Sequence, residues 1–189
     1  PEDDAYFEWS LTQAWSKLWA PKQKGKGDSN SVSIFSKYHL EFLKSLVHHG
    51  VKFLIIGGQA AIYYGVRRNT GDLDILVEPN RQNGEKLLKA FQEMELVVED
   101  LRPEEFEQQL FLGLGFEPDA VDILSIAPGV DFDSAFRQSS VIEDSHVKLH
   151  IISLDDLIKN KEALNREGEK KLLDQYDVAV LKKIKQQQK

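Results

Sequence analysis

The chain has 189 residues, enough for one domain with its own core and a short appendage, and its hydrophobic fraction of 41% is normal for a soluble globule. It contains no cysteine, which excludes disulfide bonds, thiolate zinc sites and cysteine nucleophiles. The 24 Lys and Arg against 31 Asp and Glu give a net charge of -7, the wrong sign for broad contact with duplex nucleic acid.

The N-terminal residues 1–30 are expected to form an appendage to a main domain at residues 31–189. Four apolar residues share one face at helical spacing: Leu11, Trp15, Leu18 and Trp19. This spacing predicts a short amphipathic helix, and the glycine- and lysine-rich stretch at 21–30 predicts a flexible linker. The apolar face of the helix either packs on its own domain or docks on a second copy of the chain or a cognate partner.

Helices and strands alternate through the main domain. In chain order the predicted elements are a helix at 33–50, a strand at 51–56, a short helix at 59–64, a strand at 73–77, a helix at 81–95, strands at 111–116, 121–126 and 147–152, a helix capped by Ser153, and a helix at 167–185. Asp156 is expected to complete a capping box with Ser153. The fold class is therefore α/β, a mixed sheet covered by helices with an N-terminal helical extension. No apolar run approaches the ~20 residues of a membrane span, and the acidic first residues do not resemble a signal peptide, so we expect a cytoplasmic protein.

Asp72 and Asp74 begin a predicted strand, so their carboxylates point to the same face while Leu73 points into the core. Two like charges placed in this way repel, and a divalent cation is the simplest agent that offsets the repulsion. Alternatively, Asp72 serves only the preceding turn and Asp74 is solvated. Asp122 interrupts another apolar strand, where a lone buried carboxylate is costly unless it joins the first two. An exposed position on an edge strand is the alternative for Asp122.

Gly57 and Gly58 lie between a buried strand and a helix, where glycine lets the backbone approach a ligand and the first amides of a helix can bind phosphate. A tight structural turn is the alternative. Arg68 and Thr70 precede the carboxylates and offer a guanidinium and a hydroxyl to phosphate oxygens, unless Arg68 is merely solvated. A second basic group lies further along the chain: Lys159, Lys161, Arg166, Lys170 and Lys171.

The combination of residues 54–58, thirteen intervening residues and residues 72–75 resembles the signature of the DNA polymerase β-type nucleotidyltransferase superfamily. A narrower pattern is similar to minimal bacterial nucleotidyltransferases, including AbiEii-type toxins of abortive-infection systems. The residues that carry it are Gly57, Gly58, Ala60, Gly65, Arg68, Thr70, Asp72 and Asp74. The resemblance continues through Asp122 and the segment from Ile152 to Lys161, and covers roughly residues 34–181.

The resemblance implies a transferase that moves a nucleoside monophosphate from ATP or another nucleoside triphosphate to a hydroxyl. Asp72, Asp74 and Asp122 would be the catalytic and metal-binding carboxylates, with Mg²⁺ or Mn²⁺ as the ion. The residues implied in nucleotide binding are Gly57, Gly58, Gln59, Arg68, Thr70 and Lys161. The acceptor stays open between an RNA end, a protein side chain and a small molecule, and the biological setting implied is a toxin–antitoxin or phage-defence system. Because no substantial acceptor-binding domain follows the core, a catalytically inactive nucleotide-binding or regulatory module is the alternative.

Overall fold

The fold is built around a mixed β-sheet. The computed structural model describes residues 8–10, 33–96, 98 and 100–188, and in these residues seven strands form one sheet in the order β1-β4-β5-β3-β2-β7-β6. The strands are β1 (Glu8–Ser10), β2 (Phe53–Ile55), β3 (Asp72–Val77), β4 (Phe111–Leu114), β5 (Ala120–Leu124), β6 (Ser140–Asp144) and β7 (Val147–Ile151). Parallel and antiparallel neighbours alternate across the sheet, so the predicted mixed α/β class is confirmed.

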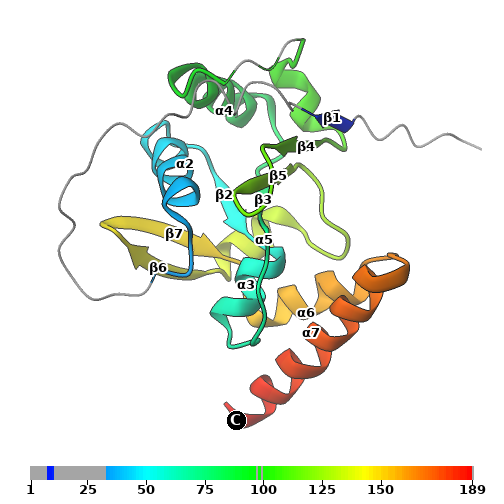
Figure 1. Cartoon of the computed structure of the whole chain (residues 1–189). Coiled ribbons are helices and arrows are strands. Elements are labelled where there is room, and N and C mark those ends of the chain that lie inside the picture. The colour runs from blue at the N-terminus through cyan, green and yellow to red at the C-terminus, as the bar shows by residue number, and fades with distance from the viewer. Residues whose placement is uncertain (1–7, 11–32, 97, 99, 189) are drawn as a thin grey trace, which may run out of the picture.

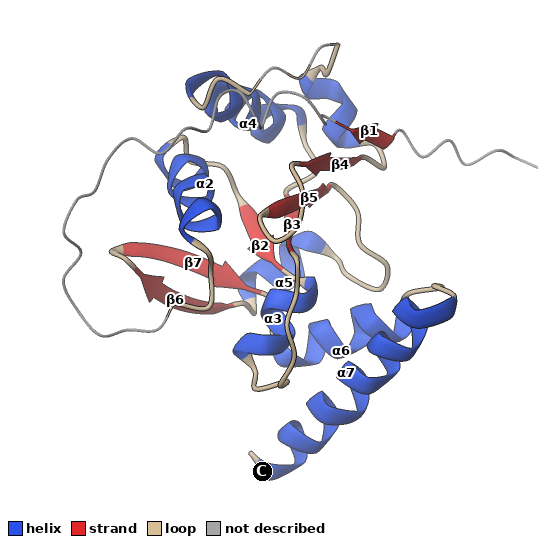
Figure 2. Cartoon of the chain, viewed as in Figure 1, coloured by secondary structure: helices blue, strands red, loops and turns tan. Residues whose placement is uncertain are grey.

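Helices cover the sheet in two groups, as Figure 1 and Figure 2 show. The helices are α2 (Lys37–His48), α3 (Gly57–Tyr63), α4 (Arg81–Glu93), α5 (Phe132–Arg137), α6 (Leu154–Ala163) and α7 (Gly168–Gln187), with a 3₁₀ turn at Pro103–Glu107. Helices α2 and α4 contact each other at one end of the molecule, whereas α6 and α7 form a pair at the other end. Between these groups, α3 lies against β3 and α6. None of the helices in the described residues is long and apolar enough to cross a membrane.

The apolar periodicity of the sequence becomes the core. Phe42, Leu43 and Leu46 on the inner face of α2 are almost fully buried, as are Leu87 and Phe91 of α4. The residues of β2 are all buried, as its continuous apolar run predicted. Because α2 and α4 bury their apolar stripes in this core, the positions of their ends are fixed by packing.

Local start signals account for several helix boundaries. The side chain of Ser36 accepts the His39 N–H and caps α2, and the side chain of Asn80 accepts the Asn83 N–H and caps α4. The predicted cap at Ser153 is confirmed, since it accepts the Asp156 N–H. The Asp156 carboxylate accepts a hydrogen bond from the Ser153 hydroxyl at 2.9 Å. A capping box would instead have it accept from the Ser153 backbone N–H, so the contact between the two side chains differs from the predicted box.

Three features differ from the sequence predictions. Residues Glu8–Ser10 form the strand β1, parallel to β4, rather than part of the amphipathic helix predicted for the N-terminal extension. The remainder of that helix and the linker at 21–30 lie outside the described residues.

The second difference is that β6 and α5 form in a segment for which neither was predicted. Strand β6 lies at the edge of the sheet and buries neither face, so it lacks the apolar alternation that identifies a strand. The third difference is that α3 begins at Gly57, so Gly57 and Gly58 are its first two residues, whereas the helix was predicted to begin at residue 59.

Candidate functional site

The strands β3 and β5 bring three carboxylates to one place. They are parallel neighbours in the middle of the sheet, and their register sets Asp74 directly opposite Asp122. The side chains of each strand alternate between faces, so Leu73 and Val121 are buried while Asp72, Asp74 and Asp122 share the other face. One carboxylate oxygen from each lies within 4.8 Å of the other two. Because β5 is an interior strand, the alternative of an exposed edge position for Asp122 is wrong.

The glycine pair allows the backbone to approach these carboxylates. Gly57 has a φ of +61°, and a Cβ atom at this position would lie 1.9 Å from Oδ2 of Asp74. The Gly58 N–H donates to the same oxygen at 3.4 Å, and a Cβ on Gly58 would lie 2.5 Å from Oγ1 of Thr70. The Thr70 hydroxyl donates to Oδ1 of Asp72 at 2.6 Å. The two glycines and Thr70 therefore lie directly beside the acidic cluster.

The pKa values of Asp74 and Asp122 are raised in the metal-free protein. Burial, and then the charge of Asp72, raise the pKa of Asp74 to about 6, against weaker opposing effects of the Gly58 N–H, Arg166 and Lys161. Burial, followed by the charges of Asp74 and Asp72, raises the pKa of Asp122 to about 7. Lys170 and Arg166 oppose that shift from the far side of the site. Nearby positive groups offset little of the negative charge of these carboxylates. Three converging carboxylate oxygens are the ligand set that a hard divalent cation prefers.

This cluster should make the stability of the metal-free protein depend on pH. A carboxyl whose folded-state pKa lies above its usual value of 3.8 binds its proton more tightly when folded, so its contribution to stability is lost as pH rises from about 4 to 7. We expect Asp122→Asn to be more stable than wild type at pH 8 by roughly 1 kcal/mol, after allowance for solvent screening, and the difference to vanish near pH 4. Urea unfolding in the presence of a chelator at a series of pH values measures this difference. Equal pH profiles for the two proteins would contradict the assignment.

A network of buried ion pairs forms the opposite wall. The Arg68 guanidinium donates to both oxygens of Asp177, with Nε at 2.9 Å and Nη2 at 3.0 Å. The Lys161 ammonium lies 2.8 Å from Asp177 and 3.1 Å from Asp174. Arg166 approaches the other oxygen of Asp174 at 3.6 Å. Two of the cations predicted to contact a nucleotide, Arg68 and Lys161, thus already have carboxylate partners on α7.

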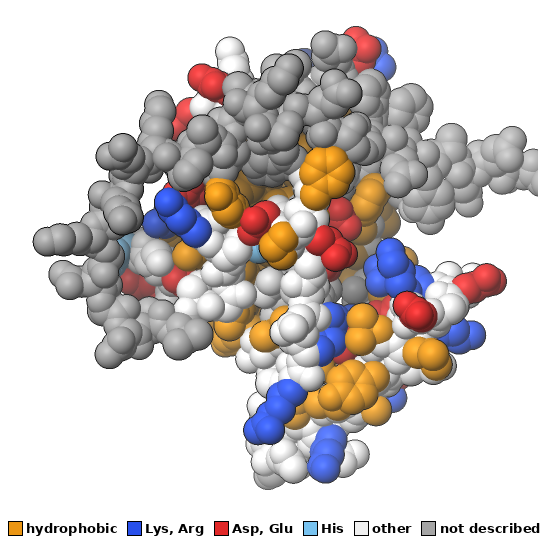
Figure 3. Space-filling model, viewed as in Figure 1, with side chains coloured by type: hydrophobic (Ala, Val, Ile, Leu, Met, Phe, Trp, Pro, Cys, Tyr) orange, Lys and Arg blue, Asp and Glu red, His pale blue; other side chains and the backbone are white. Residues whose placement is uncertain are grey.

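The carboxylates and this wall enclose a cavity of about 270 Å³ between the sheet and the α6–α7 pair. Figure 3 shows acidic and basic side chains close together on this side of the molecule. Eight of the nine predicted site residues line the cavity, and Gln59 does not; the eight are Gly57, Gly58, Arg68, Thr70, Asp72, Asp74, Asp122 and Lys161. Gln59 is instead buried, with no hydrogen-bond partner for its Oε1 among the described residues.

The cavity therefore has eight of the nine predicted site residues in its wall, and the ninth, Gln59, belongs to the core behind it. Sequence reasoning did not single out other residues of the lining, among them Glu117, Asn160 and Asp174. One signal for the ion-pair network was present in the sequence. Asp174 and Asp177 are three residues apart on one face of a helix that also carries the buried Leu181, and acids on such a face need cationic partners.

Comparisons with known proteins add no assignment: the chain matches no protein-family model, and no curated protein matches it significantly.

Proposed function

We propose that the chain is a metal-dependent nucleotidyltransferase that moves a nucleoside monophosphate from a nucleoside triphosphate to a hydroxyl acceptor. The observation that supports this most directly is the convergence of Asp72, Asp74 and Asp122 within 4.8 Å of one another on adjacent strands. The proposal also rests on the resemblance of the glycine and aspartate motifs to the DNA polymerase β-type superfamily. A cavity lined by these carboxylates and by basic residues suits a ligand that carries phosphates.

In the proposed reaction, the acceptor hydroxyl attacks the α-phosphorus, the bond to the β-phosphate breaks, and pyrophosphate leaves. Asp122, which lies directly opposite Asp74 on the neighbouring strand, takes the hydroxyl proton. Mg²⁺ or Mn²⁺ held by the three carboxylates would neutralise the developing charge and orient the reacting oxygens. Arg166 and Lys170 line the cavity opposite the carboxylates and offset the charge of the triphosphate.

Label transfer tests the proposal. Purified protein is incubated with each α-labelled nucleoside triphosphate, Mg²⁺ or Mn²⁺, and a mixture of cellular RNA and protein. We expect wild type to label an acceptor, whose mobility identifies its class, and Asp72→Asn/Asp74→Asn to give no label above background. A matched control is Asp133→Asn/Asp155→Asn, which makes the same change of charge at two exposed positions and should retain transfer. Equal transfer by wild type and Asp72→Asn/Asp74→Asn would contradict catalysis at these carboxylates.

The second candidate function is a nucleotide-binding regulatory module without transfer. The observation that favours it is the engagement of Arg68 and Lys161 with Asp177 and Asp174, which leaves fewer cations for a triphosphate. Binding of nucleoside triphosphate with no labelled product under any of the conditions above would favour this candidate over the transferase.

A further inference from the structure

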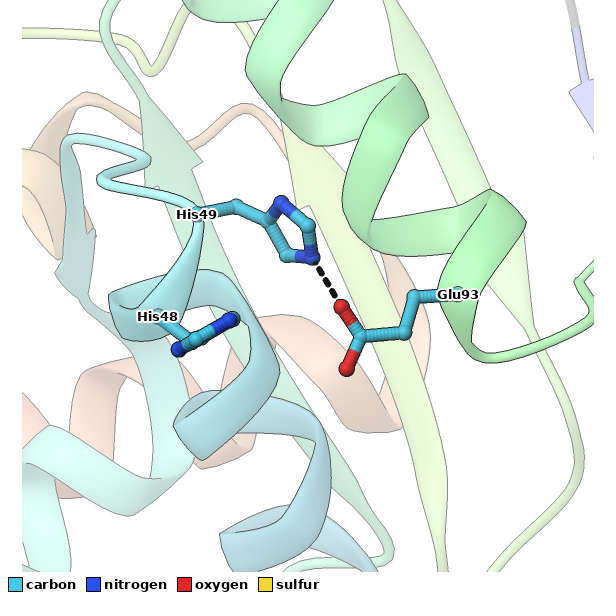
Figure 4. A group of neighbouring side chains, drawn as sticks. All are labelled: His48, His49 and Glu93. Carbon is cyan, nitrogen blue, oxygen red and sulfur yellow. Dashed lines mark hydrogen bonds and ion pairs between the residues drawn. The ribbon is translucent and has the colours of Figure 1, made fainter.

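Two helices end side by side on a surface that takes no part in the carboxylate site. Helix α2 ends at His48 and is followed by His49, and helix α4 ends at Glu93. Figure 4 shows the side chains of these three residues turned toward one another across the gap between the helices. None of them lines the cavity that contains Asp72, Asp74 and Asp122.

The three side chains present donor atoms at short range. Nε2 of His49 and the Glu93 carboxylate share a hydrogen bond, and the His48 and His49 rings meet edge to face with centroids 5.2 Å apart. One ligand atom from each residue lies within 4.8 Å of the other two. His49 is partly buried, whereas His48 and Glu93 are exposed, so an ion can reach the cluster from solvent.

Both helix ends are held rigidly. After α2, the Gly50 N–H donates to the Val47 carbonyl and the Val51 N–H donates to the Leu46 carbonyl, each at 3.0 Å, which closes a Schellman motif. After α4, the Glu95 and Leu96 N–H groups close the same motif on Gln92 and Phe91. Phe42 and Phe91 pack between the two helices with ring centroids 6.4 Å apart. The three ligands therefore stand on backbone that binding does not have to order.

Electrostatics at the cluster also favour a cation. The C-termini of α2 and α4 both reach it, and the partial negative charge at the end of each helix attracts positive charge within the last turn. Glu93 adds a formal negative charge. Two imidazoles with one carboxylate are a ligand set that suits zinc, copper or nickel, whereas magnesium prefers oxygen ligands alone.

We propose that His48, His49 and Glu93 bind one zinc-class transition-metal ion that joins the end of α2 to the end of α4. The ion has three protein ligands, and solvent completes its coordination. This site has nitrogen ligands, whereas the carboxylate cluster has oxygen ligands only. The two sites should therefore prefer different cations, zinc-class ions here and magnesium at the carboxylates. The proposal does not depend on nucleotidyl transfer.

The site is tested by isothermal titration calorimetry, in which Zn²⁺ is added to chelator-treated protein at neutral pH. We expect wild type to bind one equivalent of zinc. His49→Ala and His48→Ala should each lower the zinc affinity by at least about tenfold, because loss of a direct ligand costs no less than loss of an outer-shell partner. Glu93→Gln should also weaken it. The equivalent should persist in His146→Asn, which removes an exposed histidine elsewhere, and in Asp72→Asn/Asp74→Asn. With Cu²⁺ in place of zinc, the electron paramagnetic resonance spectrum should show nitrogen coupling that His49→Ala reduces.

Thermal unfolding of each variant without metal shows whether it is folded, so loss of binding can be told apart from loss of structure. Three results would overturn the proposal: wild type that binds no zinc equivalent, folded His48→Ala and His49→Ala proteins whose affinity stays within about twofold of wild type, or an equivalent that disappears in Asp72→Asn/Asp74→Asn.

Discussion

Lys161→Met is expected to lower the free energy of unfolding by about 3–5 kcal/mol, because it removes one partner from a buried ion-pair network. The Lys161 residue is 5% exposed, and its ammonium lies between Asp174 and Asp177 of α7. Asp177 is completely buried and keeps Arg68 as its partner, but Asp174 is left with Arg166 at 3.6 Å. A buried carboxylate that loses its main counter-charge keeps its desolvation cost and loses the attraction that offset it. Urea unfolding measures the loss.

The matched control lies two residues away on the same helix. Lys159 pairs with Asp156 at 3.0 Å, but its side chain is 63% exposed, so Lys159→Met is expected to change the free energy of unfolding far less than Lys161→Met does. Lys161→Met/Asp174→Asn should recover part of the loss, since the second change removes the uncompensated charge. Equal losses in Lys161→Met and Lys159→Met would contradict a structural role for the network.

The sequence carried most of the information about the sheet and the acidic cluster. Burial on both faces was readable from the continuous apolar run of β2, and the spacing of Asp72 and Asp74 within a strand determined that they share a face. The contact of Asp122 with them depended on pairing between β3 and β5. No local pattern specifies which strands pair, so the apolar context of Asp122 could suggest that contact but not establish it.

The ion pairs in the wall opposite the carboxylates were harder to predict from the sequence. Arg68 and Lys161 were singled out as cations for a nucleotide, yet the structure pairs both with Asp177, which is 109 residues away from Arg68 along the chain. The contact of Lys161 follows from the packing of α6 against α7, and that of Arg68 from the position of α7 beside the loop that precedes β3. Helical periodicity predicts each helix but not where it packs. Gln59 shows the same limit, since its place next to the glycines did not determine which way its side chain points.

Gly57→Ala is expected to disrupt the acidic cluster without removing any of its chemical groups. A Cβ atom at this position would lie 1.9 Å from Oδ2 and 2.5 Å from Cγ of Asp74, so the carboxylate must move. We expect the variant to lose about 1–3 kcal/mol of stability to this overlap, in addition to the cost of placing alanine at a φ of +61°. If the proposed function holds, displacement of a metal-binding carboxylate by about 1 Å should lower nucleotidyl transfer roughly a hundredfold.

Gly50→Ala separates the steric effect from the backbone effect. Gly50 has a φ of +67°, close to that of Gly57, but a Cβ on it would meet nothing within 4 Å. This variant should therefore bear the conformational cost alone and keep full transfer activity. Urea unfolding and label transfer, measured side by side on both variants, give the comparison. If Gly57→Ala loses no more stability than Gly50→Ala, then Asp74 can move away from the backbone at no cost, and the close approach of the glycine turn does not hold the carboxylate in place.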